Sequence, residues 1–361
     1  MSNPKFLILT NHSYMLWQFR RELIAELLKQ GEVVVALPFG EHIEDFKAMG
    51  CRMVDIDVDR RGINPIKDLK LYREYKRLLK IEKPDMVVTY SIKPNVYGGY
   101  ACQRQKIPYC VNVQGLGTAF QKKGLAQLVS FMYKTALKKS KVTFFENQGN
   151  MDLFLKRRIV PKEKTVLLPG AGVNLDFYSF EEYPSNDKIH FLYLGRLMKE
   201  KGMDELFTAA RGLHSENPNF ILDLVGFFED EYKATVEQLE KDGIAKFHGF
   251  QKDPRPFYAN ADCVILPSYH EGLSNVLLES AAVGRPLICS DIYGCRETVV
   301  DGVSGYLVKV KDSESLKDAM SKFCSLSCEQ RKEMGKYGRR YIEENFNKIH
   351  VVEKTINAVL K

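Results

Sequence analysis

The sequence predicts an α/β protein built from two Rossmann-like domains. Short apolar strands alternate with amphipathic helical patterns, as in a parallel sheet covered by helices on both faces. The alternation is interrupted by a polar, turn-rich stretch at 179–188 and restarts at Ile189. A chain of 361 residues is long enough for two such domains, each with its own core.

The first domain is predicted to span residues 1–173, and the second to span residues 174–339. Seven strands are expected in the first, at Phe6–Thr10, Val33–Leu37, Cys51–Ile56, Met86–Tyr90, Tyr109–Val113, Val142–Glu146 and Thr165–Leu168. Helical patterns lie between them at Trp17–Lys29, Ile66–Ile81 and Leu125–Lys138. Four apolar residues at Cys263–Leu266 predict a buried strand in the second domain.

A loop and a short helix follow that strand. Ser274 is a good N-cap, Val276–Val283 forms the helical stretch, and Gly284 stands where a glycine ends a helix. Open α/β sheets bind ligands at the carboxyl ends of their strands, where this loop lies. We therefore expect the amides of residues 273–276 to form an anion site at the helix N-terminus.

Two carboxylates frame this anion site. Glu271 lies in the loop, and Glu279 lies about one turn into the helix. Carboxylates repel phosphate, but they accept hydrogen bonds from hydroxyl groups. A ligand with phosphate at the amides and hydroxyls at the carboxylates would be a nucleotide sugar. An ordinary strand–helix unit with two solvated glutamates would give the same sequence pattern.

The surrounding motifs resemble those of the family 4 retaining glycosyltransferases, which have the GT-B fold. The matching motifs are Pro267-Ser268 followed by Glu271-x7-Glu279, Gly284-x-Pro286, Asp291-x2-Gly294-x2-Glu297 and Gly195-Arg196-x4-Lys201-Gly202. This resemblance covers almost the whole chain. It implies two domains facing across a cleft, with a C-terminal helix, about residues 340–361, returning to the first domain.

The resemblance also implies roles for individual residues. Glu271 would hold donor-sugar hydroxyls, Glu279 the ribose, and Arg196 with Lys201 the departing diphosphate, whose charge they would stabilise. The catalytic candidates are thus Arg196, Lys201 and Glu271. Further donor-binding candidates are Gly195, Gly226, Phe250, Gly272, Leu273, Ser274 and Asn275.

Loops after the predicted strands of the first domain supply candidates for the acceptor side: Asn11, His12, Lys93, Gln114 and Thr118. The segments at 91–95 and 112–118 resemble a subgroup of the family that builds bacterial surface glycans on polyprenyl-diphosphate lipids. Some members carry a histidine where this chain has Gln114, so an acceptor-side role for Gln114 remains open. For His12, contact with a hydroxyl or phosphate and no role at all are equally consistent with the sequence.

No metal and no other cofactor is expected. Asp55-x-Asp57-x-Asp59 has the form of a Mn²⁺ motif, but its acids alternate with Ile56 and Val58 as the exposed face of a strand end would. An arginine and a lysine at the diphosphate would replace the metal.

Charge is distributed unevenly. Residues 1–173 hold 29 Lys+Arg against 16 Asp+Glu (+13), whereas the remainder holds 24 against 30 (−6), which together give the net +7. The segment 120–141 has six lysines and no acid, with Leu125, Leu128, Val129, Met132, Ala136 and Leu137 on roughly one face. We expect this basic helix to contact an anionic inner-leaflet surface, although a core-packed helix with a lysine-rich outer face fits too.

The eight cysteines include no Cys-x-x-Cys pair. We therefore expect them to be reduced core residues of a cytoplasmic protein.

The predicted function is transfer of a sugar, with retention, from a nucleotide sugar, expected to be UDP-linked, to a polyprenyl-diphosphate-linked glycan. Nucleic acid is not an expected partner. Two alternatives are a nucleotide-sugar epimerase of the same fold and a non-catalytic module that binds nucleotide sugars or anionic surfaces.

Overall fold

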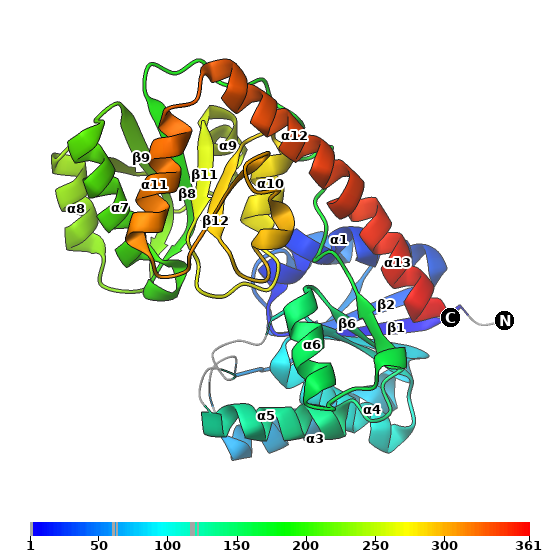
Figure 1. Cartoon of the computed structure of the whole chain (residues 1–361). Coiled ribbons are helices and arrows are strands. Elements are labelled where there is room, and N and C mark those ends of the chain that lie inside the picture. Colours follow the sequence, from blue (N-terminus) through cyan, green and yellow to red (C-terminus); the bar gives the residue numbers. More distant parts are fainter. Residues whose placement is uncertain (1–2, 60–61, 63, 116–119, 121–122) are drawn as a thin grey trace. The chain divides into compact units, whose positions relative to one another are not determined.

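The chain forms two compact units, each with its own parallel sheet (Figure 1). The computed structural model describes residues 3–59, 62, 64–115, 120 and 123–361. The first unit comprises Met1–Ala171 and Ile349–Lys361, and the second comprises Gly172–Lys348. The division therefore lies within two residues of the predicted boundary at 173, while the C-terminal segment joins the first unit from residue 349 rather than from about 340.

The first unit contains a seven-stranded sheet in the order β3-β2-β1-β4-β5-β6-β7. Its strands are β1 (Lys5–Leu9), β2 (Glu32–Leu37), β3 (Arg52–Asp55), β4 (Met86–Tyr90), β5 (Tyr109–Val113), β6 (Val142–Phe145) and β7 (Thr165–Leu167). All pairings are parallel. The seven strands predicted here are confirmed, with ends that differ by at most one residue.

Two helical layers cover this sheet. One contains α3 (Pro65–Glu82), the π-helix η1 (Pro94–Gly98), α4 (Gly99–Gln105), α5 (Lys123–Ala136) and α6 (Gln148–Lys156), and the other contains α1 (Ser13–Gln30), α2 (Ile43–Ala48) and α13 (Lys348–Leu360). The strand residues alternate between them: Leu7 and Leu9 pack with the first layer, and Phe6 and Ile8 with the second. Both faces of the sheet are therefore buried, as the apolar strands require.

The second unit contains a six-stranded parallel sheet in the order β10-β9-β8-β11-β12-β13. Its strands are β8 (Ile189–Leu197), β9 (Phe220–Phe228), β10 (Ala245–Phe247), β11 (Cys263–Leu266), β12 (Leu287–Ser290) and β13 (Gly305–Val308). Its helices are α7 (Met203–Glu216), α8 (Lys233–Lys241), α9 (Arg255–Asn260), α10 (Asn275–Ala282), α11 (Ser313–Cys324) and α12 (Cys328–Phe346), with short 3₁₀ turns η4 (Lys199–Lys201) and η5 (Arg296–Thr298). Another 3₁₀ turn, η3 (Lys162–Lys164), precedes β7 in the first unit.

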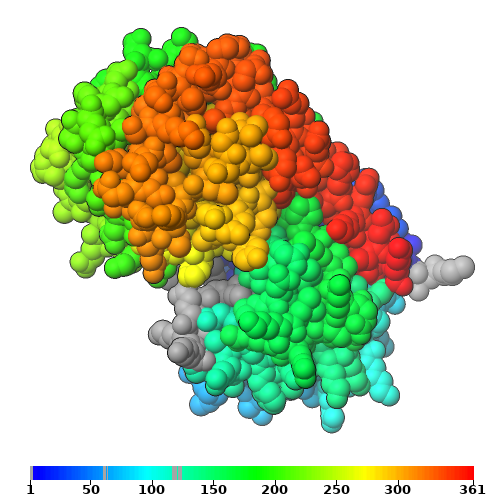
Figure 2. Space-filling view, in the orientation of Figure 1, coloured from blue at the N-terminus to red at the C-terminus, as the bar shows by residue number. Residues whose placement is uncertain are grey.

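The long helix α12 packs beside α10, and the two lie next to each other in Figure 2, in orange-red and gold. Arg339 of α12 donates from Nη1 to the carbonyl of Ala282 at 2.6 Å, which satisfies an acceptor at the end of α10 that has no partner within the helix. This contact fixes the end of the helix whose first turn carries the predicted anion site.

Arg285, which follows α10, is completely buried, and all its hydrogen bonds to the described residues are to backbone carbonyls. Its guanidinium donates to backbone carbonyls from three segments, including Tyr258 at 2.9 Å, Ala259 at 2.8 Å and Glu182 at 2.9 Å. Burial lowers the pKa of Arg285 to about 10. The guanidinium thus ties the linker, the end of α9 and the end of α10 together.

All eight cysteines are free thiols, six of them buried, whereas Cys324 is partly exposed and Cys328 is exposed. Within the described ranges, none of the helices is both long and apolar enough to cross a bilayer.

Candidate functional site

The second unit brings Lys201 and Glu271 into direct contact. Gly202, with φ +75°, ends the turn after β8 and lies so close to Pro267 that a Cβ would meet its carbonyl oxygen at 2.1 Å. Tyr269 donates its amide to the carbonyl of Glu200 at 2.8 Å, which joins the same two loops. As a result, Lys201 Nζ lies 2.5 Å from Glu271 Oε1, at the carboxyl ends of adjacent strands β8 and β11.

Arg196, near the end of β8, also has a carboxylate partner. Its Nη1 donates to Oε2 of Glu229, which follows β9. The buried Tyr193 donates its hydroxyl to the carbonyl of Arg196 at 2.6 Å and so fixes the backbone there. Sequence reasoning missed Glu229, although Glu229-Asp230-Glu231 is an acidic run directly after a strand and its place beside Arg196 follows from the β8–β9 register.

Glycines occupy the carboxyl ends of β8 and β9 and the turn after β10. Gly226 pairs in register with Gly195, and its amide donates to the carbonyl of Gly249 at 2.9 Å. A Cβ on Gly226 would meet the carbonyl oxygen of Gly195 at 1.8 Å, so only glycine fits. Exposed rings of Phe227 and Phe250 flank this row, with centroids 6.4 Å apart. Sequence reasoning selected Phe250 and missed Phe227.

The predicted N-cap of α10 is confirmed. The Ser274 hydroxyl accepts from the amide of Leu277 at 3.4 Å, although its own amide donates to the carbonyl of Gly294 at 2.8 Å. The side chain of Leu273 is buried in the core. The expectation that all four amides of residues 273–276 are open to an anion is therefore wrong for Ser274, because the loop after β12 uses that donor.

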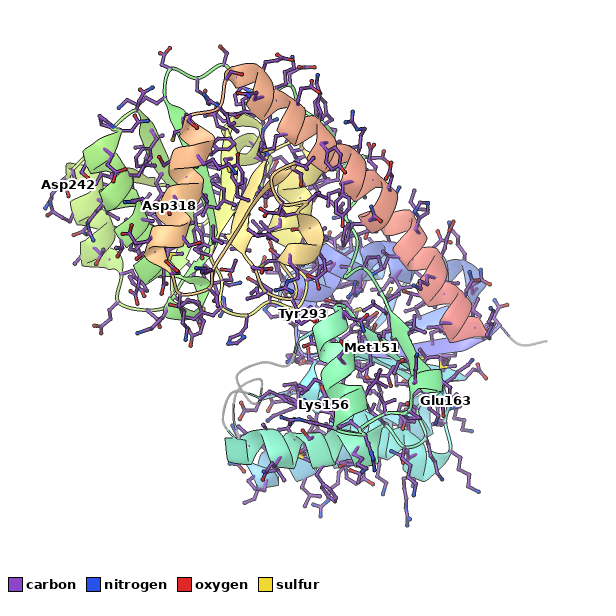
Figure 3. All side chains as sticks on the ribbon, viewed as in Figure 1. Met151, Lys156, Glu163, Asp242, Tyr293 and Asp318 are labelled. Atoms are coloured by element: carbon purple, nitrogen blue, oxygen red, sulfur yellow. The ribbon has the colours of Figure 1, made fainter. Side chains whose placement is uncertain are left out.

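Gly294 itself is held by Glu297, whose Oε2 accepts the Gly294 amide at 2.7 Å. A Cβ on Gly294 would meet the carbonyl oxygen of Gly272 at 2.4 Å. The motif Asp291-x2-Gly294-x2-Glu297 thus positions a segment that packs closely against the loop that carries Glu271 and Gly272. Tyr293, labelled in Figure 3, is the exposed residue beside Gly294.

Glu279 lies inside the protein rather than on an exposed helix face. Tyr258 donates its hydroxyl to Glu279 Oε2 at 2.9 Å. Burial raises the pKa of Glu279 to about 7, although hydrogen bonds from Tyr258 and Tyr178 and the charge of Lys348 act in the opposite direction. Two aromatic hydroxyls thus fix the carboxylate, and neither could be identified from the local motif.

In the first unit, the acceptor-side candidates follow β1, β4 and β5, which are neighbours in the sheet. Asn11 accepts from the Ser91 hydroxyl at 2.8 Å, which connects the loops after β1 and β4. His12 is the N-cap residue of α1, and Gln114 is half-buried after β5. Lys93 forms an ion pair with Asp68 of α3 at 2.7 Å. Thr118 lies outside the described residues.

Asp55 and Asp57 are exposed, while Ile56 and Val58 between and after them are buried, as the alternation predicted. Asp59 accepts from the Gly62 amide at 2.9 Å, which lowers the pKa of Asp59. In the part of the chain that the structure describes, no three His, Cys, Asp or Glu side chains are arranged to hold a metal ion.

The basic helix differs from its prediction in one respect. Leu128 was assigned to the same face as Val129, but the Leu128 side chain is 52% exposed, whereas Val129 is buried. Phe131, one turn further on, is 64% exposed. The outer face of α5 therefore carries two large apolar side chains before the exposed Lys134, because residues 128, 131 and 134 follow the helical period, and the exposed Lys138 lies in the turn after the helix.

Two family models match the chain. "Glycosyl transferase 4-like" matches residues 5–147, and "Glycosyl transferases group 1" matches residues 176–341. Together they cover most of both units.

Curated bacterial relatives match at similar length. An N,N'-diacetylbacillosaminyl-diphospho-undecaprenol α-1,3-N-acetylgalactosaminyltransferase of Campylobacter jejuni is 27% identical over 85% of this chain and 85% of its own. A UDP-Gal:α-D-GlcNAc-diphosphoundecaprenol α-1,3-galactosyltransferase of Escherichia coli is 26% identical over 72% of this chain and 71% of its own.

Solved structures agree on the fold. HepE of Anabaena in complex with UDP-glucose superposes with a TM-score of 0.79, at 17% identity, over 98% of this chain and 99% of its own. A glycosyltransferase from Rickettsia africae gives a TM-score of 0.78, at 16% identity, over 99% and 98% of the two chains. The chain therefore belongs to the glycosyltransferases of the GT-B fold, with a 4-like first domain and a group 1 second domain.

Proposed function

We propose that this enzyme transfers a sugar from a UDP-sugar to a glycan linked to a polyprenyl diphosphate, with retention at the anomeric carbon. The observation that carries the proposal is the contact between Lys201 and Glu271 at the strand ends beside Arg196. It provides cations for a diphosphate and an acceptor for sugar hydroxyls within one small region.

The donor would lie along the carboxyl ends of β8, β9 and β11. The diphosphate would take Arg196 and Lys201 away from their present partners Glu229 and Glu271, and Glu271 would then accept from the sugar hydroxyls. The glycine row at Gly226 would let the nucleobase approach the backbone beside two exposed phenylalanine rings. The ribose would bind Glu279, whose carboxylate is fixed by hydrogen bonds from Tyr258 and Tyr178.

Two relatives support the assignment of substrates. The name of the E. coli relative specifies UDP-Gal, and the names of both relatives specify diphospho-undecaprenol acceptors and α linkages. UDP-galactose is itself α-linked at the anomeric carbon, so an α product means retention. Applied to this chain, the same chemistry favours a UDP-sugar and a retaining reaction.

In this reaction the bond between the anomeric carbon and the β-phosphate oxygen breaks as the acceptor oxygen forms a new bond to the same carbon. Negative charge develops on the departing diphosphate, where Arg196 and Lys201 would stabilise it. The acceptor proton would pass to the departing phosphate oxygen, so no protein nucleophile and no metal are required.

The outer face of α5 would hold the enzyme at the anionic membrane surface where a lipid-linked acceptor lies. Leu128 and Phe131 would enter the interface, while Lys134 and Lys138 would attract anionic headgroups by about 1 kcal/mol each. Replacing Lys134 and Lys138 with glutamate should reduce binding to anionic vesicles by at least tenfold. The charge-matched control, Lys29→Glu with Lys47→Glu on α1 and α2, should bind normally, and equal binding by both double variants would refute this surface.

The reaction itself is tested by incubating the protein with UDP-sugars, with and without a polyprenyl-diphosphate-linked sugar. We expect an acceptor-dependent product with an α linkage and stoichiometric release of UDP. Isomerisation of the donor without acceptor would instead identify an epimerase. Donor binding without any turnover across the panel would identify a non-catalytic module.

A further inference from the structure

A groove of about 630 Å³ lies on the first unit between α3 and the segment formed by η1 and α4. Three tyrosines line it: Tyr72 of α3, Tyr97 of η1 and Tyr100 of α4. Leu69, 47% exposed, forms part of the same wall. The lining is therefore mainly aromatic and aliphatic, on a domain whose charge is strongly positive.

Four polar side chains of this lining, those of Asp68, Tyr97, Tyr100 and Gln103, already form hydrogen bonds or an ion pair within the protein. Tyr97 donates its hydroxyl to Asp68 Oδ2 at 3.0 Å, and Tyr100 donates to the carbonyl of Met132 at 3.0 Å. Gln103 donates from Nε2 to the carbonyls of Thr135 and Ala136 at 2.9 and 2.8 Å. Because the polar atoms of these side chains already have partners, the surfaces that they present to the groove are ring faces and methylene groups. A ligand of this groove is therefore expected to be apolar.

One end of the groove reaches the acceptor edge of the sheet. Asp68 lines the groove and forms the ion pair with Lys93, which lies just after β4 at the carboxyl edge. From Pro65 to Tyr72 on one wall, and from Tyr97 to Arg104 on the other, the lining extends along the helices for about 10 Å. The groove thus leads from polar acceptor candidates to an apolar trough.

The rim of the groove is cationic. Arg104 is exposed at its far end, and the ammonium of Lys76 lies 5.6 Å from the Tyr72 ring centroid. Lys93 is the cation at the acceptor-edge end, where the head of a chain lying in the groove would be, whereas Arg104 and Lys76 lie toward the opposite end. An apolar trough that ends at a lysine complements a ligand that has an apolar chain and a phosphate-containing head. A free sugar would find few unsatisfied hydrogen-bonding groups here.

We infer that this groove holds the first isoprene units of the lipid-linked acceptor, next to its diphosphate. This inference rests on the proposed function for the identity of the acceptor, and it adds the place where the lipid chain binds. It predicts that the enzyme recognises the chain itself, not only the sugar diphosphate that the chain carries.

Kinetics with two water-soluble acceptors test this. Both carry the same sugar diphosphate, one on a farnesyl chain and the other on an ethyl group. The parent should have a KM for the farnesyl acceptor roughly tenfold below that for the ethyl acceptor. Leu69→Gln should raise the farnesyl KM roughly tenfold with kcat unchanged, leave the ethyl KM unchanged, and be rescued by Leu69→Met.

Ile81→Gln is the matched control, because Ile81 is an exposed apolar residue in the last turn of the same helix and does not line the groove. It should leave both KM values unchanged. Equal KM values for the two acceptors in the parent, or equal effects of Leu69→Gln on both, would overturn the inference.

Photolabelling separates failure of the inference from failure of the proposed function. Farnesyl diphosphate bearing a diazirine on its first isoprene unit should label residues within 65–72 or 97–104, and excess unlabelled farnesyl diphosphate should compete. Labelling there supports the groove even if no sugar is transferred to any acceptor. Labelling confined to other segments would refute it even if transfer to lipid-linked acceptors is observed.

Discussion

In the second unit, the cations at the carboxyl ends of the strands are paired with carboxylates that also face the candidate site: Lys201 with Glu271, and Arg196 with Glu229. In the first unit, the corresponding lysine, Lys93, is paired with Asp68 at the end of an aromatic groove. Both units use the same parallel-sheet scaffold. They differ in the groups that a ligand can contact. The second unit offers ion pairs that a ligand can exchange, and the first unit offers the faces of aromatic rings.

This difference suits the two units to different ligands, the nucleotide diphosphate in the second unit and the acceptor chain in the first. Exchangeable ion pairs suit a nucleotide diphosphate, whose charge increases as the sugar leaves. Ring faces suit a chain that takes no part in the chemistry and only positions the acceptor. Substitutions in the second unit should therefore affect kcat, whereas those around the groove should affect KM.

The largest expected effect tests whether the folding stability of the second unit depends on the buried guanidinium of Arg285. Arg285→Ala should lower the free energy of unfolding by about 3–5 kcal/mol, because several buried carbonyls lose their donor at once. Denaturant unfolding measures this. Arg211→Ala, at an exposed arginine of α7, is the control and should stay within about 0.5 kcal/mol of the parent. A parent-like midpoint for Arg285→Ala would refute the anchoring role.

Arg196→Ala tests the diphosphate clamp. Loss of one charge donor should raise the barrier by about 3 kcal/mol and lower kcat roughly a hundredfold, with little change in melting temperature. Steady-state kinetics should show normal turnover for Lys199→Ala, whose side chain is more exposed than that of Arg196. If Arg196→Ala turns over like the parent, the site does not act through this residue.

Glu279 allows a pH test of the buried carboxylate. Its folded-state pKa of about 7 lies above the ordinary 4.5, so between these pH values the folded state binds more protons than the unfolded state. Stability due to this group therefore falls as pH rises from about 4.5 to 7. Glu279→Gln should be more stable than the parent by about 1–2 kcal/mol at pH 8 and equal to it near pH 4.5.

The same variant should bind the donor more weakly at pH 8, because the amide cannot replace an ionised acceptor at the ribose. Thermal unfolding at the two pH values and calorimetric titration with UDP measure both effects. If Glu279→Gln is less stable than the parent at pH 8, burial does not destabilise the ionised carboxylate of Glu279.

The smallest expected effect is that of chelation. Because the proposed site uses Arg196 and Lys201, not a metal ion, as the positive charge at the diphosphate, we expect EDTA to change turnover by less than about twofold. Activity that disappears with EDTA and returns with Mn²⁺ would contradict the proposal that side chains alone neutralise the donor.

The sequence predicted the architecture well because apolar strands and capping residues are local signals. Ser274 and Gly284 defined α10 to within one residue, and strand spacing gave all seven strands of the first unit. Glu229 and Tyr258 were missed because their partners lie 33 and 21 residues away, so only the folded register brings them together. The face of Leu128 was misassigned because both faces of α5 carry apolar residues.

The 2.5 Å contact between Lys201 and Glu271 also has a consequence for selectivity. An anion that draws Lys201 away leaves Glu271 as a partly buried carboxylate without its partner, which is unfavourable. Inorganic phosphate or pyrophosphate cannot relieve this, because neither carries sugar hydroxyls at the right distance. A nucleotide sugar supplies both groups in one molecule. On the proposed function, the resting ion pair should therefore discriminate against inorganic phosphate and pyrophosphate without any steric barrier.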